Sequence, residues 1–338
     1  MKAAVLKDKL EIAICNVEKP IIEPKQVLVK VELCGICGSD VHAFTDLTFP
    51  PGTILGHEFS GAISEIGAEV TGWGIGQRVA VRPCGVCGQC FWCTNGQISL
   101  CPTHMETTLG LKTPGAFAEF IAVQEYQLYA LPDNITFAQA AQLEPLTVCV
   151  HAVRLADIKL GDTVLIYGAG PLGLLIYQLV RMSGAHEIYI VEKSNLRKKL
   201  ATNLGASNVY DPEEMDSGVF TQQLPKNGVD IVFECAGVSE TIQESFKVVR
   251  KGGKIILLGI SPHPVSINQF EWVFKGIEVK ASIGYFVGEF EVAIDLLRSR
   301  LINVDSLISN IIRLDDIVDE GFMQLLSPNN AAKVLVKP

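Results

Sequence analysis

The sequence has 338 residues, of which 48% are hydrophobic and 19% are charged, a composition typical of folded domains with buried cores and unlike that of disordered chains. Its formal net charge of −9 argues against a nucleic-acid partner and against an anionic membrane surface. A chain of this length is long enough for two domains of ordinary size.

The N-terminal residues alternate apolar and charged side chains, which predicts a strand and not a signal peptide. The longest uncharged run, 163–180, has the length of a membrane span, but glycines and a proline interrupt it. We therefore expect a soluble, cytoplasmic protein. Ten cysteines are present, and five of them crowd into residues 84–101, so metal binding is a better interpretation than a disulfide framework.

Short strand patterns at 3–6, 27–31 and 59–66, separated by glycine turns, predict a β-rich, barrel-like first domain. Between the second and third of these strands, residues 35–58 hold a cysteine, two histidines and several carboxylates. Cys37, His57 and a carboxylate would form a three-ligand zinc site whose fourth position stays open, as catalytic zinc requires. The competing interpretation is an irregular surface loop with polar side chains.

The cysteine-rich loop at 84–101 predicts a second metal site. Cys87, Cys90, Cys93 and Cys101 have the spacing C-x2-C-x2-C-x7-C, and four thiolates complete a tetrahedral zinc site with no open position. Such a zinc is structural, and its binding energy is folding energy, on the order of 10 kcal/mol or more. Spacing alone also permits C-x2-C-x2-C-x2-C beginning at Cys84. A DNA-reading zinc finger is disfavoured, because no basic recognition helix follows.

A helical pattern at 136–157 contains Glu144 among apolar residues, where an unpaired carboxylate would be costly. It therefore needs a partner, either a metal ion or a backbone amide at the helix end.

From residue 163 the pattern changes to alternating strands and helices. A buried strand runs into Gly168-Ala-Gly170-Pro-Leu-Gly173, an apolar helical run follows, and the next strand ends at Glu192. This placement makes G-x-G-x-x-G a strong dinucleotide fingerprint, with the pyrophosphate at the helix N-terminus. Glu192 would bind the ribose 2′-hydroxyl and so favours NAD over NADP, although Lys193 and Arg197 could soften that preference. The candidate cofactor-binding residues are Gly168, Gly170, Pro171, Leu172, Gly173, Glu192 and Arg197.

Further α/β units follow, with a strand at 229–234, a helix at 239–250 and a strand at 253–259. They extend the predicted parallel sheet. The chain then predicts a helix at 289–300 and a final strand at 332–337.

Taken together, the 35–58 stretch, the cysteine loop and the dinucleotide fingerprint resemble the zinc-dependent medium-chain alcohol dehydrogenase family, in family order and over essentially the full length. Within it, the chain is most similar to the polyol (sorbitol-type), sugar-alcohol-phosphate and threonine dehydrogenases, whose zinc-site glutamate matches Glu144 in Leu143-Glu144-Pro145. The resemblance implies an α/β fold: a GroES-like β-barrel catalytic domain (1–150 and 287–338) and a Rossmann NAD-binding domain with a doubly wound parallel sheet (151–286). The active site would lie in the cleft between them.

The resemblance also implies roles for individual residues. Cys37, His57 and a carboxylate, from Glu58, Glu144 or both, would bind the catalytic zinc. The residues implied for catalysis are, in chain order, Cys37, Ser39, Asp40, His42, His57 and Glu58. Among them Asp40 would orient His57, and Ser39 and His42 match the proton-relay positions. The structural zinc would be held by Cys87, Cys90, Cys93 and Cys101, which leaves Cys84 spare.

The expected function is reversible oxidation of a secondary alcohol to the ketone, in a polyol, sugar-alcohol phosphate, sugar acid or hydroxy-amino acid. The expected cofactors are one catalytic zinc, one structural zinc and NAD, with NADP less favoured. Family members are dimers or tetramers, so we expect a homodimer or homotetramer with a seam near 277–283. The alternatives are a zinc-deficient medium-chain reductase and a non-catalytic NAD-binding regulator. Neither needs Cys37, Ser39, His42 and His57 together.

Overall fold

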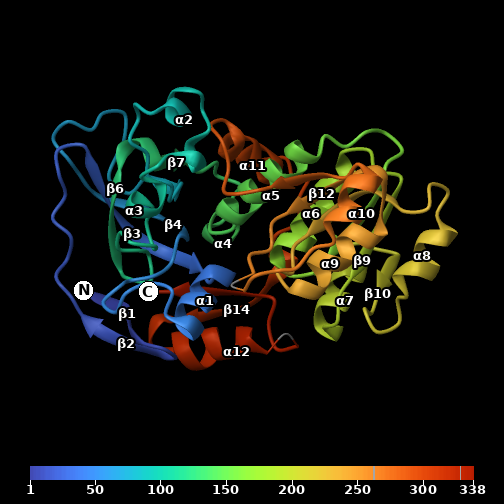
Figure 1. Cartoon of the computed structure of the whole chain (residues 1–338). Helices are drawn as coiled ribbons and strands as arrows, with labels where there is room; N and C mark the ends of the chain where they lie inside the picture. Colours follow the sequence, from blue (N-terminus) through green and yellow to red (C-terminus); the bar gives the residue numbers. More distant parts are fainter. Residues whose placement is uncertain (262, 328) are drawn as a thin grey trace. The chain divides into compact units, whose positions relative to one another are not determined.

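The structure is a computed structural model that describes residues 1–261, 263–327 and 329–338. The chain divides into two compact units, the first made of residues 1–147 and 286–338 and the second of residues 148–285. Both chain termini lie in the first unit (Figure 1). Each unit has its own sheet and its own hydrophobic core.

The first unit is built on a seven-stranded mixed sheet with the order β14-β15-β3-β4-β5-β7, in which β6 also pairs with β3. A two-stranded hairpin of β1 and β2 forms a separate sheet. Its second strand was not predicted, because none of its residues is fully buried and its pattern is weak. The strands are β1 (Lys2–Asp8), β2 (Glu11–Asn16), β3 (Gln26–Gly35), β4 (Glu58–Ile66), β5 (Arg78–Val81), β6 (Phe120–Gln124), β7 (Leu128–Ala130), β14 (Ile308–Arg313) and β15 (Lys333–Lys337).

Short helices connect these strands. They are α1 (Gly38–Asp46), α2 (Phe91–Thr94), α3 (His104–Thr107), α4 (Phe137–Ala140), α11 (Glu289–Arg298) and α12 (Met323–Leu326). The core between sheet and helices contains Phe44, Phe117 and Phe322. The ring centroid of Phe322 lies 4.9 Å from that of Phe44 and 6.2 Å from that of Phe117. Burial of each such side chain stabilises the unit by about 1.5–3 kcal/mol. The core thus fixes α1 against the sheet.

β3 is the strand that positions the candidate site. Near its carboxyl end, Gly35 pairs with Glu58, the first residue of β4, and with Leu335 of β15. The amide of Ile36 then donates to the carbonyl of Val334. Segments far apart in the sequence therefore meet where β3 ends and α1 begins.

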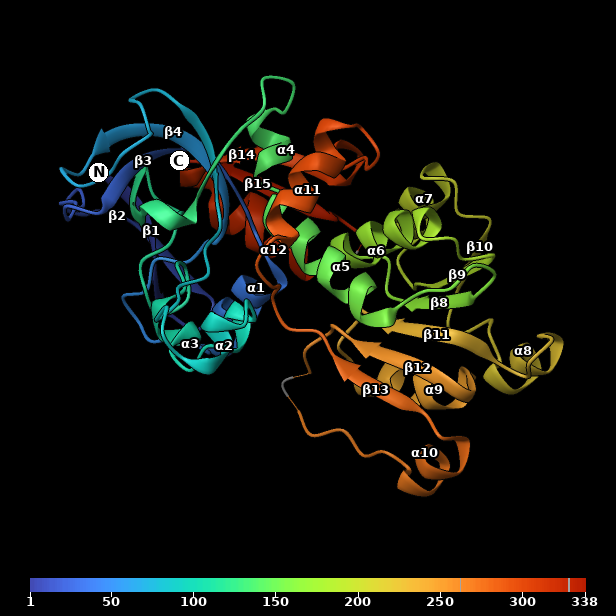
Figure 2. The ribbon, with the colours of Figure 1, turned by 90° about the horizontal axis from the view of Figure 1, so that it is seen from above.

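The second unit holds a six-stranded parallel sheet with the order β10-β9-β8-β11-β12-β13. The central strand β8 is an almost continuous apolar run, as expected where helices cover both faces of a parallel sheet. Figure 2 shows α6 and α7 beside β8–β10, and α9 and α10 beside β12 and β13. The elements are β8 (Thr163–Tyr167), α6 (Pro171–Met182), β9 (Glu187–Val191), α7 (Asn195–Asn203), β10 (Asn208–Tyr210), α8 (Ser217–Gln223), β11 (Val229–Glu234), α9 (Ser239–Val248), β12 (Val249–Leu257), α10 (Gln269–Lys275) and β13 (Glu278–Ala281).

Several element boundaries differ from the sequence-based prediction, for example those of α9 and β12. The helix expected at 239–250 ends at Val248, and the strand expected at 253–259 runs from Val249 to Leu257. The β-branched pair Val248-Val249 favours extended backbone, and both side chains are fully buried. One long helix, α5 (Leu143–Ala156), begins in the first unit and ends in the second.

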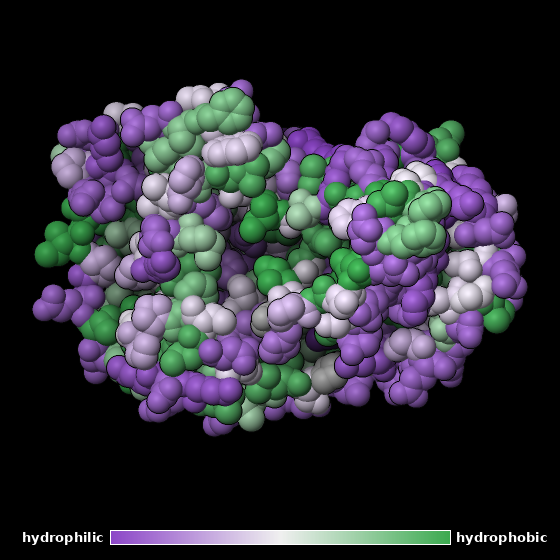
Figure 3. Space-filling model, viewed as in Figure 1, coloured by the Kyte–Doolittle hydropathy of each residue, from purple (hydrophilic) through white to green (hydrophobic). Residues whose placement is uncertain are grey.

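Over the three described ranges, no helix combines the length and apolar character needed to cross a membrane. Hydrophilic side chains cover most of the face drawn in Figure 3, and hydrophobic ones form small scattered groups.

Candidate functional site

The first candidate site forms where β3 meets α1. Cys37 is the residue that precedes α1, and His57 and Glu58 lie at the start of β4. One possible ligand atom from each of Cys37, His57 and Glu58 lies within 4.8 Å of the others. Thiolate, imidazole and carboxylate are the donors that zinc prefers, so the residues present fit a zinc ion.

Asp40 connects the Cys37 segment with the segment that contains Gly56 and His57. Its carboxylate accepts a hydrogen bond from the amide of Cys37 (2.9 Å) and another from the amide of Gly56 (3.3 Å). Nδ1 of His57 is buried without a hydrogen-bond partner, 3.6 Å from Oδ1 of Asp40. A carboxylate facing one ring nitrogen is the arrangement that orients a metal-binding histidine.

Gly56 has to be a glycine for this arrangement. Its φ is +94°, and a Cβ atom there would lie 2.9 Å from both Cys34 Sγ and the ring of Phe117. Cys34 itself is fully buried in the core, where it has a packing role.

The charges around His57 suit a divalent cation. Burial lowers the pKa of His57, but the negative charges of Asp40 and Cys37 outweigh it and raise that pKa well above its ordinary value. Burial also raises the pKa of the Asp40 carboxyl. The buried negative charges around His57 stabilise a positive charge there. A divalent metal ion would gain the same stabilisation.

Glu58 has a partner that the sequence did not reveal. Its carboxylate forms an ion pair with the ammonium group of Lys333, the first residue of β15, and both side chains are almost fully buried. Lys333 Nζ also donates to the carbonyl of Ile36 (3.0 Å). Gly35 lies beside this pair, and a Cβ atom there would overlap the Glu58 carboxylate. Lys333 therefore holds one oxygen of Glu58 in place.

Glu144 lies at the start of α5, outside the group of three residues. Burial raises its pKa to about 7, and the charges of His57 and Glu58 act on it in opposite directions. The structure thus places Glu144 within electrostatic reach of His57. Two glutamates are candidate ligands here: Glu58, which has a lysine partner, and Glu144, whose charge acts on His57 and which forms no ion pair in the part of the chain that the structure describes.

Ser39 and His42 both lie on α1, three residues apart and therefore on the same side of the helix. Ser39 is half-buried beside Cys37, whereas the His42 side chain is 46% exposed, with Nδ1 3.8 Å from Asp46. A hydroxyl near the candidate metal-binding residues and an exposed imidazole on the same helix are the kinds of group that a proton relay uses.

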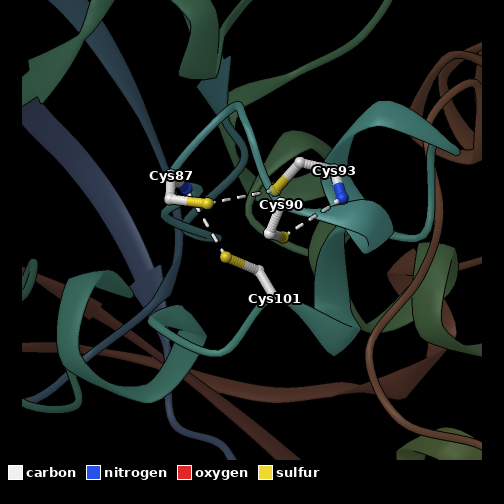
Figure 4. Close-up of side chains that lie close together, drawn as sticks. All are labelled: Cys87, Cys90, Cys93 and Cys101. Carbon is white, nitrogen blue, oxygen red and sulfur yellow. Dashed lines mark hydrogen bonds between the residues drawn. The ribbon is translucent and has the colours of Figure 1, made fainter.

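The second candidate site is the cysteine cluster drawn in Figure 4. The sulfur atoms of Cys87, Cys90, Cys93 and Cys101 all lie within 4.8 Å of one another, and those of Cys87 and Cys93 are 3.9 Å apart. Zinc–sulfur bonds of about 2.3 Å in a tetrahedron place sulfur atoms about 3.8 Å apart. The residues present therefore fit a tetrathiolate zinc site.

Cys84 is buried and lies outside this group. The alternative spacing that begins at Cys84 is thus not the one that the fold brings together. All ten cysteines fall within the described residues, and none forms a disulfide.

The third candidate site is the glycine-rich turn of the second unit. Gly168 has φ +90°, Gly170 precedes α6, and a Cβ atom on Gly173 would overlap the carbonyl of Gly168. Arg197 reaches over the turn, with Nη1 3.8 Å from the position that a Cβ of Gly170 would occupy. Pro171 and Leu172 begin α6, whose N-terminus is suited to an anion. The residues present fit the pyrophosphate of a dinucleotide.

Glu192 is tied to this turn by its own hydrogen bonds. One carboxylate oxygen accepts from the amide of Ala169 (2.7 Å), and the other accepts from the amide of Ser194 (2.8 Å). The side chain is buried. Glu192 thus fixes the glycine-rich turn in addition to the ribose contact expected from the sequence.

Comparisons with known proteins give the class of the chain. The model of the alcohol dehydrogenase GroES-like domain matches residues 23–133, and that of the zinc-binding dehydrogenase matches residues 171–299. The chain is 33% identical over 356 residues to (R,R)-butanediol dehydrogenase of Bacillus subtilis (strain 168), with 100% of both proteins covered. These matches define an oxidoreductase that acts on CH–OH donors.

Solved structures agree with this assignment. A zinc-binding dehydrogenase of Sinorhizobium meliloti 1021 bound to NADP has a TM-score of 0.89 and 34% identity, covering 100% of this chain and 99% of that one. An alcohol dehydrogenase of Escherichia coli CFT073 complexed with NADH has a TM-score of 0.92 and 27% identity, with the same coverage. The chain belongs to the zinc-dependent medium-chain alcohol dehydrogenases. The predicted family, fold class, enzyme class and cofactors, zinc and NAD, are confirmed.

Proposed function

We propose that the enzyme oxidises a secondary alcohol of a small polyol or related hydroxy compound to the ketone, with NAD as the preferred cofactor. The observation that carries this proposal is the group of Cys37, His57 and Glu58, whose ligand atoms lie within 4.8 Å of one another. A diol is the substrate named for the butanediol relative, and a polyol shares its adjacent hydroxyl groups.

The proposal assigns two zinc sites to the first unit and the dinucleotide to the second. Cys37 and His57 bind the catalytic zinc with a carboxylate from Glu58 or Glu144, and Asp40 orients His57. Cys87, Cys90, Cys93 and Cys101 bind the structural zinc. When bound, zinc would supply Lewis acidity for the alcohol group, and NAD would supply the hydride acceptor.

The residues of α1 handle the proton. The alcohol loses one proton and one hydride for each ketone formed, so the hydroxyl proton needs an acceptor. Ser39 accepts this proton as its own hydroxyl proton passes on toward His42, and the His42 imidazole, which is 46% exposed, releases a proton to solvent. Asp40 holds the Cys37 amide and the Gly56 amide, which keeps α1 and the His57 segment in register during the reaction.

A substrate panel tests this function. The enzyme is assayed with polyols, phosphorylated polyols, sugar acids and hydroxy-amino acids, and NADH formation is followed by absorbance. We expect oxidation of at least one compound with a secondary hydroxyl, and a lower rate with NADP because the Glu192 carboxylate repels a 2′-phosphate. Absence of turnover over the whole panel contradicts the proposed reaction, and a preference for NADP contradicts the role of Glu192.

Self-association is part of the same proposal. β13 is the edge strand of the second sheet, and in antiparallel pairing about a twofold axis at Val279, Glu278 would face Lys280 of a second copy. The neighbouring helix α10 exposes Phe270 and Phe274. We expect a homodimer or homotetramer, so sedimentation equilibrium should give a multiple of 36.7 kDa. A mass of one chain at micromolar concentration contradicts this.

A cytoplasmic location is also proposed. It is supported by ten cysteines without disulfides, because zinc-binding thiols persist in a reducing compartment.

A further inference from the structure

A buried carboxylate that no motif singled out organises the second unit beside the glycine-rich turn. Glu234 is the last residue of β11, and its side chain is 0% exposed. Oε1 accepts from the amides of Ala236 and Gly237, both at 3.0 Å, and from the hydroxyl of Thr241 at 2.7 Å. Over the described ranges Glu234 forms no ion pair, so these donors alone compensate its charge.

These hydrogen bonds place Glu234 at the N-terminus of α9. The residue before α9 is Val238, whose side chain cannot accept a hydrogen bond from the first turn. Glu234 does not accept from a first-turn amide, but it accepts from the hydroxyl of Thr241 in that turn, and its negative charge interacts favourably with the positive end of the helix dipole. A carboxylate with no cation is thus retained inside the core because it holds the 235–237 turn and the helix start together.

The turn held by Glu234 packs against the glycine-rich turn. The amide of Cys235 donates to the carbonyl of Tyr167 (2.9 Å), the residue before Gly168. A Cβ atom on Gly168 would lie 3.3 Å from both the Cβ and the amide nitrogen of Ala236. On the other side, a Cβ atom on Gly259 would overlap Gly237. The turns that follow β8, β11 and β12 therefore meet around the Glu234 carboxylate.

The sheet topology indicates that a ligand binds near the point where these turns meet. The strand order β10-β9-β8-β11-β12-β13 reverses direction between β8 and β11, and ligands of such sheets bind outside the carboxyl ends of the strands at that reversal. The adenosine half of a dinucleotide belongs to the half of the sheet that contains Glu192. The nicotinamide half belongs to the half that contains β11 and β12.

We propose that Glu234 is a positioning residue for the nicotinamide half of the cofactor: it fixes the 235–237 turn beside Gly168 and so shapes the surface that this half binds. The proposal rests on the assignment of the dinucleotide to the second unit. It predicts that Glu234 affects the two halves of the cofactor differently, whereas Glu192 acts on the adenosine half.

The test compares NADH with AMP, which carries only the adenosine half. In Glu234→Gln, the new amide group directs N–H donors at the N–H donors of the turn, which loosens it. We expect the Kd for NADH, measured by nicotinamide fluorescence, to rise at least about tenfold, as for loss of a hydrogen bond to a charged group. The Kd for AMP, measured by calorimetry, should change less than about twofold, because Glu192 and its contacts remain.

Asp230→Asn is the matched control, because Asp230 is a buried acid (2% exposed) at the amino end of the same strand. Its carboxylate accepts from the Thr163 amide and from Lys226 and Arg250. This variant should lower the melting temperature but leave the ratio of the two Kd values unchanged.

Equal weakening of NADH and AMP in Glu234→Gln, or an unchanged ratio, overturns the proposal and leaves Glu234 a purely structural residue. If Glu234→Gln does not fold, Thr241→Val removes only one donor, and a shift of the ratio in the same direction is then required. Failure of the unaltered enzyme to bind AMP would contradict the assignment of the dinucleotide to the second unit, which separates the two claims.

Discussion

Cys37→Ala is expected to reduce kcat by about a thousandfold or more while NADH binding stays intact. Loss of one of three protein ligands releases the catalytic zinc, and a zinc that polarises the reacting oxygen contributes several kcal/mol, of which about 4 kcal/mol corresponds to a thousandfold in rate. The glycine-rich turn proposed to bind NADH lies in the second unit, whereas Cys37 lies in the first. The measurements are steady-state kinetics, NADH fluorescence and zinc content by atomic spectroscopy.

Cys34→Ala provides the matched control for this substitution. Cys34 is a fully buried thiol three residues earlier on the chain, beside the site but outside the group of metal-binding residues. Its replacement should cost about 1 kcal/mol of stability and leave zinc content and turnover largely unchanged. If Cys37→Ala retains full activity, or if both variants lose activity to the same extent, the assignment of Cys37 is wrong.

Cys87→Ala is expected to impair folding of the first unit more than it impairs the chemistry of correctly folded molecules. A structural zinc contributes about 10–16 kcal/mol of apparent binding energy, which is comparable to the whole stability of a domain. In the segment at 87–101 only Ile98, Ser99 and Cys101 are buried, so few packed side chains hold this segment in place without a metal. Soluble yield, melting temperature and protease sensitivity of this segment measure the effect.

The control is Cys84→Ala, which removes a buried thiol from the same segment but from outside the cluster. We expect it to keep the structural zinc and to lower the melting temperature less than Cys87→Ala does. A Cys87→Ala protein with the same melting temperature and zinc content as the unaltered enzyme would show that the cysteine cluster does not hold the metal. Equal damage from Cys84→Ala would favour the alternative spacing.

Local features of the enzyme could be predicted from its sequence. The four clustered cysteines lie within fifteen residues, so their spacing alone defines a possible metal site. The glycine-rich turn is equally local, because strand, turn and helix follow one another directly. Periodicity also predicted most strands and helices, with errors at boundaries such as Val248-Val249, where buried β-branched residues fit either element.

Features that depend on distant residues could not be predicted. Lys333 and Glu58 are separated by 275 positions, and their pairing follows from the register of β3 with β4 and β15. Glu234 is different from this ion pair, because all the hydrogen-bond partners of its side chain lie within seven residues of it. An acidic residue at the end of an apolar strand, three residues before a glycine, is a signal that the sequence itself contains. Spacing alone could not identify Cys84 as the spare cysteine, because both spacings are chemically acceptable; the family resemblance implies it, and the fold brings the other four cysteines together.

The zinc content of the purified enzyme tests the central claim most directly. The account predicts about two zinc ions per chain, one at each site, with one of them lost in Cys37→Ala. A chain that folds and binds NADH but contains no zinc would contradict the claim that this enzyme is a zinc-dependent alcohol dehydrogenase with both sites intact.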